Sequence, residues 1–286
     1  MLAGLIAGCG RLGFEGVAAD GAVDLGADGA SVFATGAFSV PVPIAGLNSV
    51  FQEDEPTLTG DLLEIYFERT DSGSSKIYVS TRASIADSWA TPTLVPLTCG
   101  GCASPLISRD GLTLVYAADR VVPTGIETYQ VIRPSRGQPW GPELRLSVTE
   151  GYKTGTLSAD GLTAYLTYFT TRYNIYTSRR ATQGDVWGAP SVLPDLLGPS
   201  ADSNPALLDE DRRVVFASRR PGGQGGDDLY LASRADAAAA FEAPAAILGV
   251  SSSADDEDPW MSDDGHVLVF MSTRGEPMGD LYIATR

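Results

Sequence analysis

Three acidic residues, Glu53, Asp202 and Asp256, occupy corresponding places in a repeating sequence pattern, each three residues before a proline. Carboxylates that converge in a narrow space concentrate negative potential, and they supply the oxygen ligands that calcium prefers. We therefore predict a binding site for a cation, a basic peptide or a neutral ligand. Its expected members are Glu53, Asp54, Asp202, Asp256 and Asp258, with Asp255 beside them. The alternative is structural: each carboxylate accepts hydrogen bonds from backbone or arginine groups that lock neighbouring parts of the fold together.

Trp260 directly follows one of these prolines, Pro259, and stands four residues after Asp256. A tryptophan beside an acidic group can stack on a ligand, and we include it in the predicted ligand site. Packing inside the fold is the competing interpretation, because large aromatic side chains usually contribute buried area.

The other reactive side chains are few. Cys99 and Cys102 are separated by two glycines, and in an exported protein this spacing predicts a disulfide that closes a short loop. A zinc site would need ligands beyond these two, and the chain has a single histidine, His266. No serine or cysteine motif with nucleophile spacing accompanies that histidine, so we expect a protein that is not an enzyme and that has no cofactor. Calcium at the acidic site is the one ion considered.

The acidic residues belong to five sequence repeats. A tyrosine is followed four residues later by an arginine at a nearly constant period, and an aromatic residue with a proline shortly after it recurs in the same rhythm. Each repeat contains four short apolar segments separated by turn residues, including three Asp-Gly pairs. Because Val, Ile, Tyr and Leu dominate the segments, we predict an all-β five-bladed β-propeller of four-stranded antiparallel blades. The tyrosine and arginine pairs are Tyr78/Arg82, Tyr129/Arg133, Tyr176/Arg180, Tyr230/Arg234 and Tyr282/Arg286.

The fifth repeat ends after its third segment, at Arg286. Phe38 to Ile44 carries the aromatic residue and the following proline that mark a fourth segment. We expect this N-terminal strand to complete the fifth blade and to close the ring, which removes an exposed sheet edge.

The repeats resemble the WD40-like, TolB-type β-propeller family. The resemblance rests on Asp202-Ser203-Asn204-Pro205 with Asp228-Leu229-Tyr230, and on Asp256-Glu257-Asp258-Pro259 with Asp280-Leu281-Tyr282. It implies the propeller fold and a place in the cell envelope, where such repeats serve assembly factors, surface proteins and accessory domains of peptidases. Some five-bladed propellers are glycosidases, so a carbohydrate-active protein using carboxylates at the channel mouth, lectin-like or catalytic, is the alternative function.

The N-terminal segment Leu5-Ile6-Ala7-Gly8-Cys9 resembles a bacterial lipobox, which implies lipidation of Cys9 and an anchor in the periplasm or at the cell surface. We expect residues 1–9 to be the remnant of a lipoprotein signal with its true start upstream, 10–36 a flexible tether rich in Gly, Ala and Asp, and 37–286 the propeller.

Composition narrows the partners. The chain of 286 residues has a net charge of −16, which repels phosphate backbones and excludes nucleic acid as an expected partner. The longest apolar run is shorter than the roughly 20 residues of a spanning helix, so membrane contact would come only through the lipid. We therefore predict a monomeric, lipid-anchored, non-catalytic propeller that binds another envelope protein or a cationic or neutral ligand.

Overall fold

A computed structural model of the chain describes residues 33–119, 127–146, 153–182 and 185–286. The compact unit extends from Ala34 to Arg286. Cys9 and most of the expected tether lie outside the described residues. Within them, no helix has the length and apolar character needed to cross a membrane.

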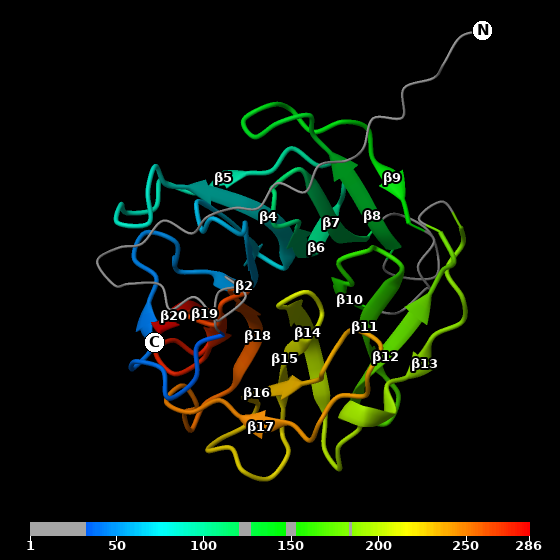
Figure 1. Ribbon diagram of the computed structural model, residues 1–286. Coiled ribbons are helices and arrows are strands. Elements are labelled where there is room, and N and C mark those ends of the chain that lie inside the picture. Colours follow the sequence, from blue (N-terminus) through cyan, green and yellow to red (C-terminus); the bar gives the residue numbers. More distant parts are fainter. Residues whose placement is uncertain (1–32, 120–126, 147–152, 183–184) are drawn as a thin grey trace, which may run out of the picture. The chain divides into compact units, whose positions relative to one another are not determined.

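The compact unit consists of five four-stranded antiparallel sheets arranged around a common centre (Figure 1). The predicted five-bladed β-propeller is thus confirmed. Blades one to four follow the chain in order, and each passes from its innermost strand outwards. Their strands are β2 (Gln52–Leu58), β3 (Glu64–Asp71), β4 (Ser74–Thr81) and β5 (Thr93–Leu94); β6 (Gly101–Ile107), β7 (Thr113–Asp119), β8 (Glu127–Ile132) and β9 (Leu144–Arg145); β10 (Lys153–Leu157), β11 (Thr163–Phe169), β12 (Tyr173–Arg179) and β13 (Ser191–Val192); β14 (Asp202–Leu208), β15 (Arg213–Ser218), β16 (Asp228–Ser233) and β17 (Ala245–Ala246).

The fifth blade joins the two ends of this unit. It contains β18 (Asp256–Met261), β19 (Val267–Ser272) and β20 (Asp280–Thr285), with β1 (Val42–Pro43) on its outer edge. Val42 lies opposite Ile283 and Pro43 opposite Tyr282, and the Ile44 amide donates to the Leu281 carbonyl at 2.9 Å. The predicted closure by the N-terminal strand is therefore what the structure has, although the regular pairing is shorter than Phe38 to Ile44.

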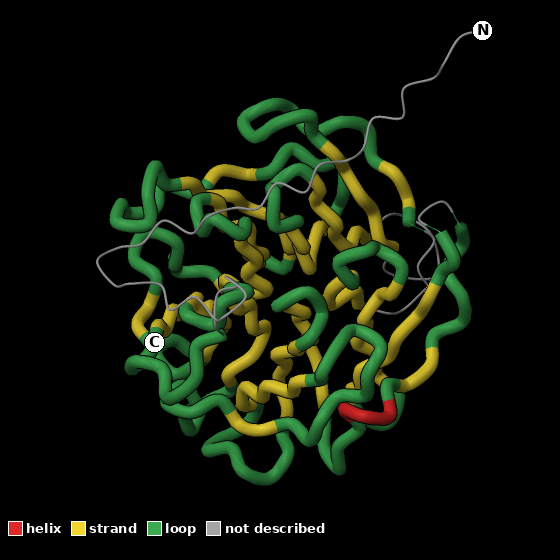
Figure 2. The backbone as a smooth tube through the Cα atoms, in the orientation of Figure 1, coloured by secondary structure: helices red, strands yellow, loops and turns green. Residues whose placement is uncertain are grey.

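Loops form most of the outer surface, as the tube in Figure 2 shows. One short 3-10 helix, η1 (Pro194–Leu196), interrupts them among the described residues. The run from Ala237 to Ala240 lies in the loop between β16 and β17.

Each blade is fastened on its outer side by the repeated arginine. The arginine stacks over the aromatic residue that precedes the outermost strand, and its Nε donates to a carbonyl in the turn between the first two strands. Arg82 over Trp89, for example, has its guanidinium carbon 4.3 Å from the ring centre and donates to the Leu62 carbonyl at 2.8 Å. The same contact recurs in all five blades, so these arginines hold each blade together on its outer side. The other pairs are Arg133 with Trp140, Arg180 with Trp187, Arg234 with Phe241 and Arg286 with Phe38.

The innermost strand of every blade contains a β-bulge, seen as a register shift against the second strand. In four blades the bulged residue has a left-handed backbone and stands directly before the repeated proline. In blade three a glycine replaces that proline: a Cβ on Gly155 would lie 2.6 Å from the Pro205 side chain. The bulges turn polar residues towards the centre of the ring. These residues are Glu55, Ser104, Asn204 and Asp258.

Candidate functional site

The three corresponding acids, Glu53, Asp202 and Asp256, are buried and paired with arginines of their own blades. Arg69 donates to Glu53 at 2.6 Å and Arg220 donates to Asp202 at 2.6 Å. Arg274 donates to Asp256 at 2.5 Å. We call this arrangement the acid–arginine clamp.

Each clamp also closes the turn that leads into the innermost strand. The carboxylate of Asp202 accepts the Gly198 amide at 3.0 Å, and the Arg220 Nη2 that donates to Asp202 also donates to the Leu196 carbonyl at 2.8 Å. Arg220 stacks over Phe216 and Tyr230, with centroid distances of 4.9 and 5.4 Å. Glu53 accepts the Ser49 amide and Asp256 accepts the Ser252 amide in the same way. This geometry favours the structural alternative for the three acids, because their oxygens are engaged in holding the blade.

The centre of the ring is narrow. A channel segment of about 60 Å³ lies between the bulges, lined by residues that include Glu55, Ser104, Asn204 and Asp258. Trp260 lines the same segment and is only 5% exposed. Arg109 reaches across from blade two, stacks 4.7 Å from the Trp260 ring and donates to the Met261 carbonyl at 3.2 Å. Trp260 therefore packs between the channel wall and an arginine, which supports packing over ligand stacking for this residue.

One end of the channel widens into a cavity of about 490 Å³. Its walls come from the starts of the innermost strands of blades one, four and five and from the β11–β12 hairpin of blade three. Two predicted site residues, Asp54 and Asp258, line this cavity. The charged lining residues are Asp54, Glu55, Asp227, Glu257, Asp258, Arg172 and Arg219. We call this space the mouth cavity.

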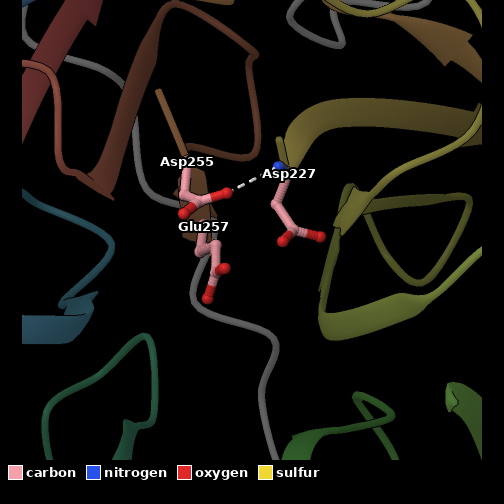
Figure 3. Close-up of side chains that lie close together, drawn as sticks. All are labelled: Asp227, Asp255 and Glu257. Atoms are coloured by element: carbon pink, nitrogen blue, oxygen red, sulfur yellow. Dashed lines mark hydrogen bonds between the residues drawn. The ribbon is translucent and has the colours of Figure 1, made fainter. Parts of the chain in front are cut away.

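Three carboxyl groups, those of Asp227, Asp255 and Glu257, lie close together (Figure 3), and two of them, Asp227 and Glu257, line the mouth cavity. Asp255 and Glu257 lie at the start of β18, and Asp227 lies just before β16 of the neighbouring blade. One oxygen of each lies within 4.8 Å of one oxygen of each of the others. The Asp255 carboxylate accepts the Asp227 amide at 3.1 Å, which ties the two blades together. Arg219 donates to Asp227 at 2.6 Å and lies 3.6 Å from Asp255.

The Glu257 carboxyl has the most perturbed acidity in this group. Burial, followed by the negative charges of Asp258 and Asp227 and a hydrogen bond with Asp227, raises the pKa of Glu257 to about 8. At neutral pH the Glu257 carboxyl therefore holds a proton, and it is hydrogen-bonded to Asp227. A cation that entered the cluster would favour the ionised form and release that proton.

Asp227 and Glu257 were missed in the sequence. Side chains alternate along a strand, so the buried Asp256 and its neighbour Glu257 must face opposite ways. That alternation was the available signal for Glu257. For Asp227 the sequence offered no signal beyond its position before Asp228-Leu229-Tyr230, because the approach of Asp227 to β18 depends on how two blades pack.

The mouth cavity also has an aromatic rim. Phe169 and Tyr173 lie at the two ends of the β11–β12 hairpin turn and both line the cavity. Their rings meet edge to face with centroids 5.1 Å apart, and their exposed fractions are 56% and 45%. Large aromatic side chains exposed beside a cavity offer a surface on which a cation or a sugar ring can rest.

The remaining predicted residues lie away from this cavity. Cys99, in the loop that joins blade one to blade two, forms a disulfide with Cys102 at the start of β6. His266 is exposed at the start of the second strand of blade five, 3.4 Å from Asp264. The single histidine therefore stands apart from the three carboxylates.

Comparison with known proteins bears on the fold. No family model matches the chain, and no curated protein matches it. Among solved structures it is similar to a protein assigned to TolB from Agrobacterium tumefaciens, with 18% identity, a TM-score of 0.51, and coverage of 83% of this chain and 79% of that one.

Glycoside hydrolase propellers are similar as well. The catalytic domain of a Coprinopsis cinerea GH62 α-L-arabinofuranosidase shares 12% identity at a TM-score of 0.58, covering 89% of this chain and 97% of that one. The Podospora anserina α-L-arabinofuranosidase PaAbf62A, in complex with cellotriose, shares 11% sequence identity at a TM-score of 0.59. The match covers 87% of this chain and 96% of that one. At such identities the likeness concerns the fold alone. The chain is thus a five-bladed β-propeller structurally similar both to TolB and to GH62 glycosidases.

Proposed function

We propose that this propeller is a non-catalytic binding module that takes a positively charged ligand in the mouth cavity. The observation that carries the proposal is the meeting of Asp227, Asp255 and Glu257 at the side of a cavity of about 490 Å³. The cavity is larger than a bare ion requires, so the proposed ligand is a basic segment of a partner protein in the cell envelope.

The charges of the cavity support a cationic ligand. Its described lining holds five carboxyl groups, of which Glu257 is protonated at neutral pH, against two arginines, and the whole chain is acidic. Clustered negative charge in a concave site attracts cations and speeds their approach at low salt. The exposed rings of Phe169 and Tyr173 add a rim that can receive a lysine or arginine side chain by cation–π contact.

Calorimetric titration with a lysine-rich peptide tests the proposal. We expect binding by the wild-type chain that weakens with salt and is lost in a variant with both Asp227→Asn and Glu257→Gln. Asp71→Asn changes an exposed acid at the end of β3 and serves as the charge-matched control. Absence of binding in 20 mM salt, or equal binding by the double variant, contradicts the proposal.

Calcium is the competing occupant of the same carboxylates. It is bound by six to eight oxygen ligands, and the three carboxyl groups supply part of such a set. Arg219 would have to leave Asp227 for the ion to enter. Calcium that raises the melting temperature of the wild type but not of the double variant identifies the cluster as an ion site.

A carbohydrate-active protein is the second candidate, and the exposed Phe169 and Tyr173 favour it. Catalysis by two carboxylates needs a separation of about 5–5.5 Å for retention or roughly 6.5–9.5 Å for inversion. One oxygen of each clustered carboxyl group lies within 4.8 Å of one oxygen of each of the others, so an activity assay has to distinguish sugar binding from hydrolysis. Xylo-oligosaccharide binding that is lost in Phe169→Ala and Tyr173→Ala supports a carbohydrate-active protein. Release of sugar from the bound oligosaccharide then identifies a glycosidase, and binding without release identifies a lectin-like protein.

We further propose that the protein is exported and anchored through a lipid on Cys9. Expressed in a bacterial host, the protein should partition into detergent and carry the mass of the lipid. Cys9→Ser should abolish both properties. Unchanged fractionation of that variant would contradict the anchor and would leave the binding proposal intact.

A further inference from the structure

Cys102 occupies the position that an acid fills in three other blades. It stands three residues before Pro105, as Glu53, Asp202 and Asp256 stand before their prolines, and it begins the innermost strand of its blade beside Gly101. Like those acids it is buried, with an exposed fraction of 2%. Blade two therefore has a cysteine where blades one, four and five have the acid of the acid–arginine clamp.

The disulfide holds the same turn as the clamp. In blade four the Asp202 carboxylate reaches back four residues to the Gly198 amide, and in blade five Asp256 reaches back to Ser252. In blade two Cys102 reaches back to Cys99 through a covalent bond. Each link fastens the turn to the first residues of the innermost strand. Arg120 stands at the same sequence offset from Cys102 as Arg220 does from Asp202, although Arg120 lies outside the described residues.

This turn is connected to the wall of the mouth cavity. Two residues after Cys102, Ser104 donates its amide to Glu55 at 2.5 Å and its hydroxyl to the same carboxylate at 2.9 Å. Glu55 belongs to blade one and lines both the channel and the mouth cavity. The start of β6 thus positions a charged residue of the cavity across a blade boundary.

We propose that the Cys99–Cys102 disulfide is a redox-operated counterpart of the acid–arginine clamp, and that its reduction loosens the start of β6 and the hold of Ser104 on Glu55. A dithiol supplies two electrons and two protons. One thiolate of the dithiol attacks the sulfur of Cys99, because Cys99 is half-buried and more accessible than the buried Cys102. The bond between the two cysteine sulfurs breaks, and Cys102 leaves as a thiolate and is then protonated. The second thiol of the reductant then displaces Cys99 as a thiol, and the reductant becomes a cyclic disulfide. The consequence for ligand binding rests on the proposed function, whereas the loosening itself does not.

Amide hydrogen exchange of the oxidised and the dithiothreitol-reduced chain tests the proposal without any ligand. We expect exchange in residues 101–107 to rise roughly tenfold on reduction, because a closed short loop restrains the neighbouring backbone. Exchange in β14 of blade four, whose clamp has no cysteine, should stay unchanged. Cys99→Ser with Cys102→Ser should exchange like the reduced wild type and should not respond to dithiothreitol.

A matched variant in another blade distinguishes the local effect of the disulfide from a general loosening of the propeller. Asp202→Asn removes the clamp of blade four, so exchange should rise in β14 and not in β6. The proposal is overturned if reduction leaves residues 101–107 as protected as before, if β14 responds equally, or if Cys99 and Cys102 are free thiols in protein prepared under oxidising conditions. If peptide binding is absent while these exchange changes occur, the proposed function is wrong, and the proposal about the Cys99–Cys102 disulfide is still supported.

Discussion

At the residue scale, the acidic side chains divide by the face of the strand on which they lie. Glu53, Asp202 and Asp256 face into their blades and neutralise arginines, while Asp54 and Glu257, one position further on, line the mouth cavity. A carboxylate that accepts an arginine and a backbone amide satisfies a buried charge. A carboxyl group close to other carboxylates instead keeps its proton, or it ionises when a cation binds nearby.

The clamp predicts a clear effect of removing one partner. Asp202→Asn should lower the free energy of unfolding by about 3 kcal/mol, because Arg220 then stays buried without its counter-ion. Urea denaturation measures this loss, and added calcium should not change it. Asp71→Asn, at an exposed position, should have little effect. A loss no larger than that of Asp71→Asn would show that the clamp contributes nothing.

The pKa of Glu257 predicts a dependence of stability on pH. This pKa is about 8 in the folded protein, above the ordinary value of 4.5, so the folded state binds more protons between these two pH values. Stability contributed by this group is present below about pH 4.5 and is lost as pH rises through 8. Glu257→Gln should therefore flatten the decline in melting temperature between pH 5 and 9. Glu242→Gln, outside the mouth cavity, should follow the wild type; identical profiles for both variants would refute the assignment.

At the scale of the element, the fifth blade depends on contacts between residues far apart in sequence. Phe38 stacks 4.3 Å under the Arg286 guanidinium, and the Ser39 amide donates to Thr285 at 2.7 Å. Arg286 in turn donates to the Gly265 carbonyl at 2.8 Å, as the other repeated arginines do in their blades. The N-terminal strand thus fills the place that β5, β9, β13 and β17 fill elsewhere.

Truncation tests this closure. Removal of residues 1–46 should cost far more stability than removal of 1–30, because only the first takes away β1 and Phe38 and exposes the edge of β20. Thermal melts of the two truncated chains measure the difference. Phe38→Ala in the full chain should give an intermediate loss through the stacked Arg286. Equal melting temperatures for the two truncations would contradict closure by this strand.

At the scale of the whole molecule, the ring combines a closed set of sheets with a large excess of negative charge. The chain carries 36 acidic and 20 basic residues. The clamps and the outer arginine contacts use several of the basic groups within the blades, and the chain keeps a net charge of −16. A net charge far from zero favours solubility but opposes compaction through self-repulsion.

Ionic strength should therefore stabilise the protein. Raising sodium chloride from 0.02 to about 0.2 M shortens the range of charge–charge interactions to about 8 Å and reduces repulsion among exposed carboxylates, whereas the buried clamp pairs are screened less. We expect the melting temperature to rise over this interval. A fall would mean that surface ion pairs, rather than repulsion, dominate.

The sequence by itself determined the blade count and the closing strand, because both depend on local patterns that recur in every blade. The turn glycines illustrate this: Gly111, Gly161 and Gly265 adopt the positive φ that their Asp-Gly pairs predict. The sequence also placed Asp54 and Asp258 in the candidate site. Tertiary structure alone decided that Asp202 and its two counterparts serve arginines, and that Asp227 meets Glu257 across a blade boundary. The physical reason is that hydrogen bonding and alternation fix a side chain within one blade, whereas the approach of two carboxylates depends on how neighbouring blades pack around the channel.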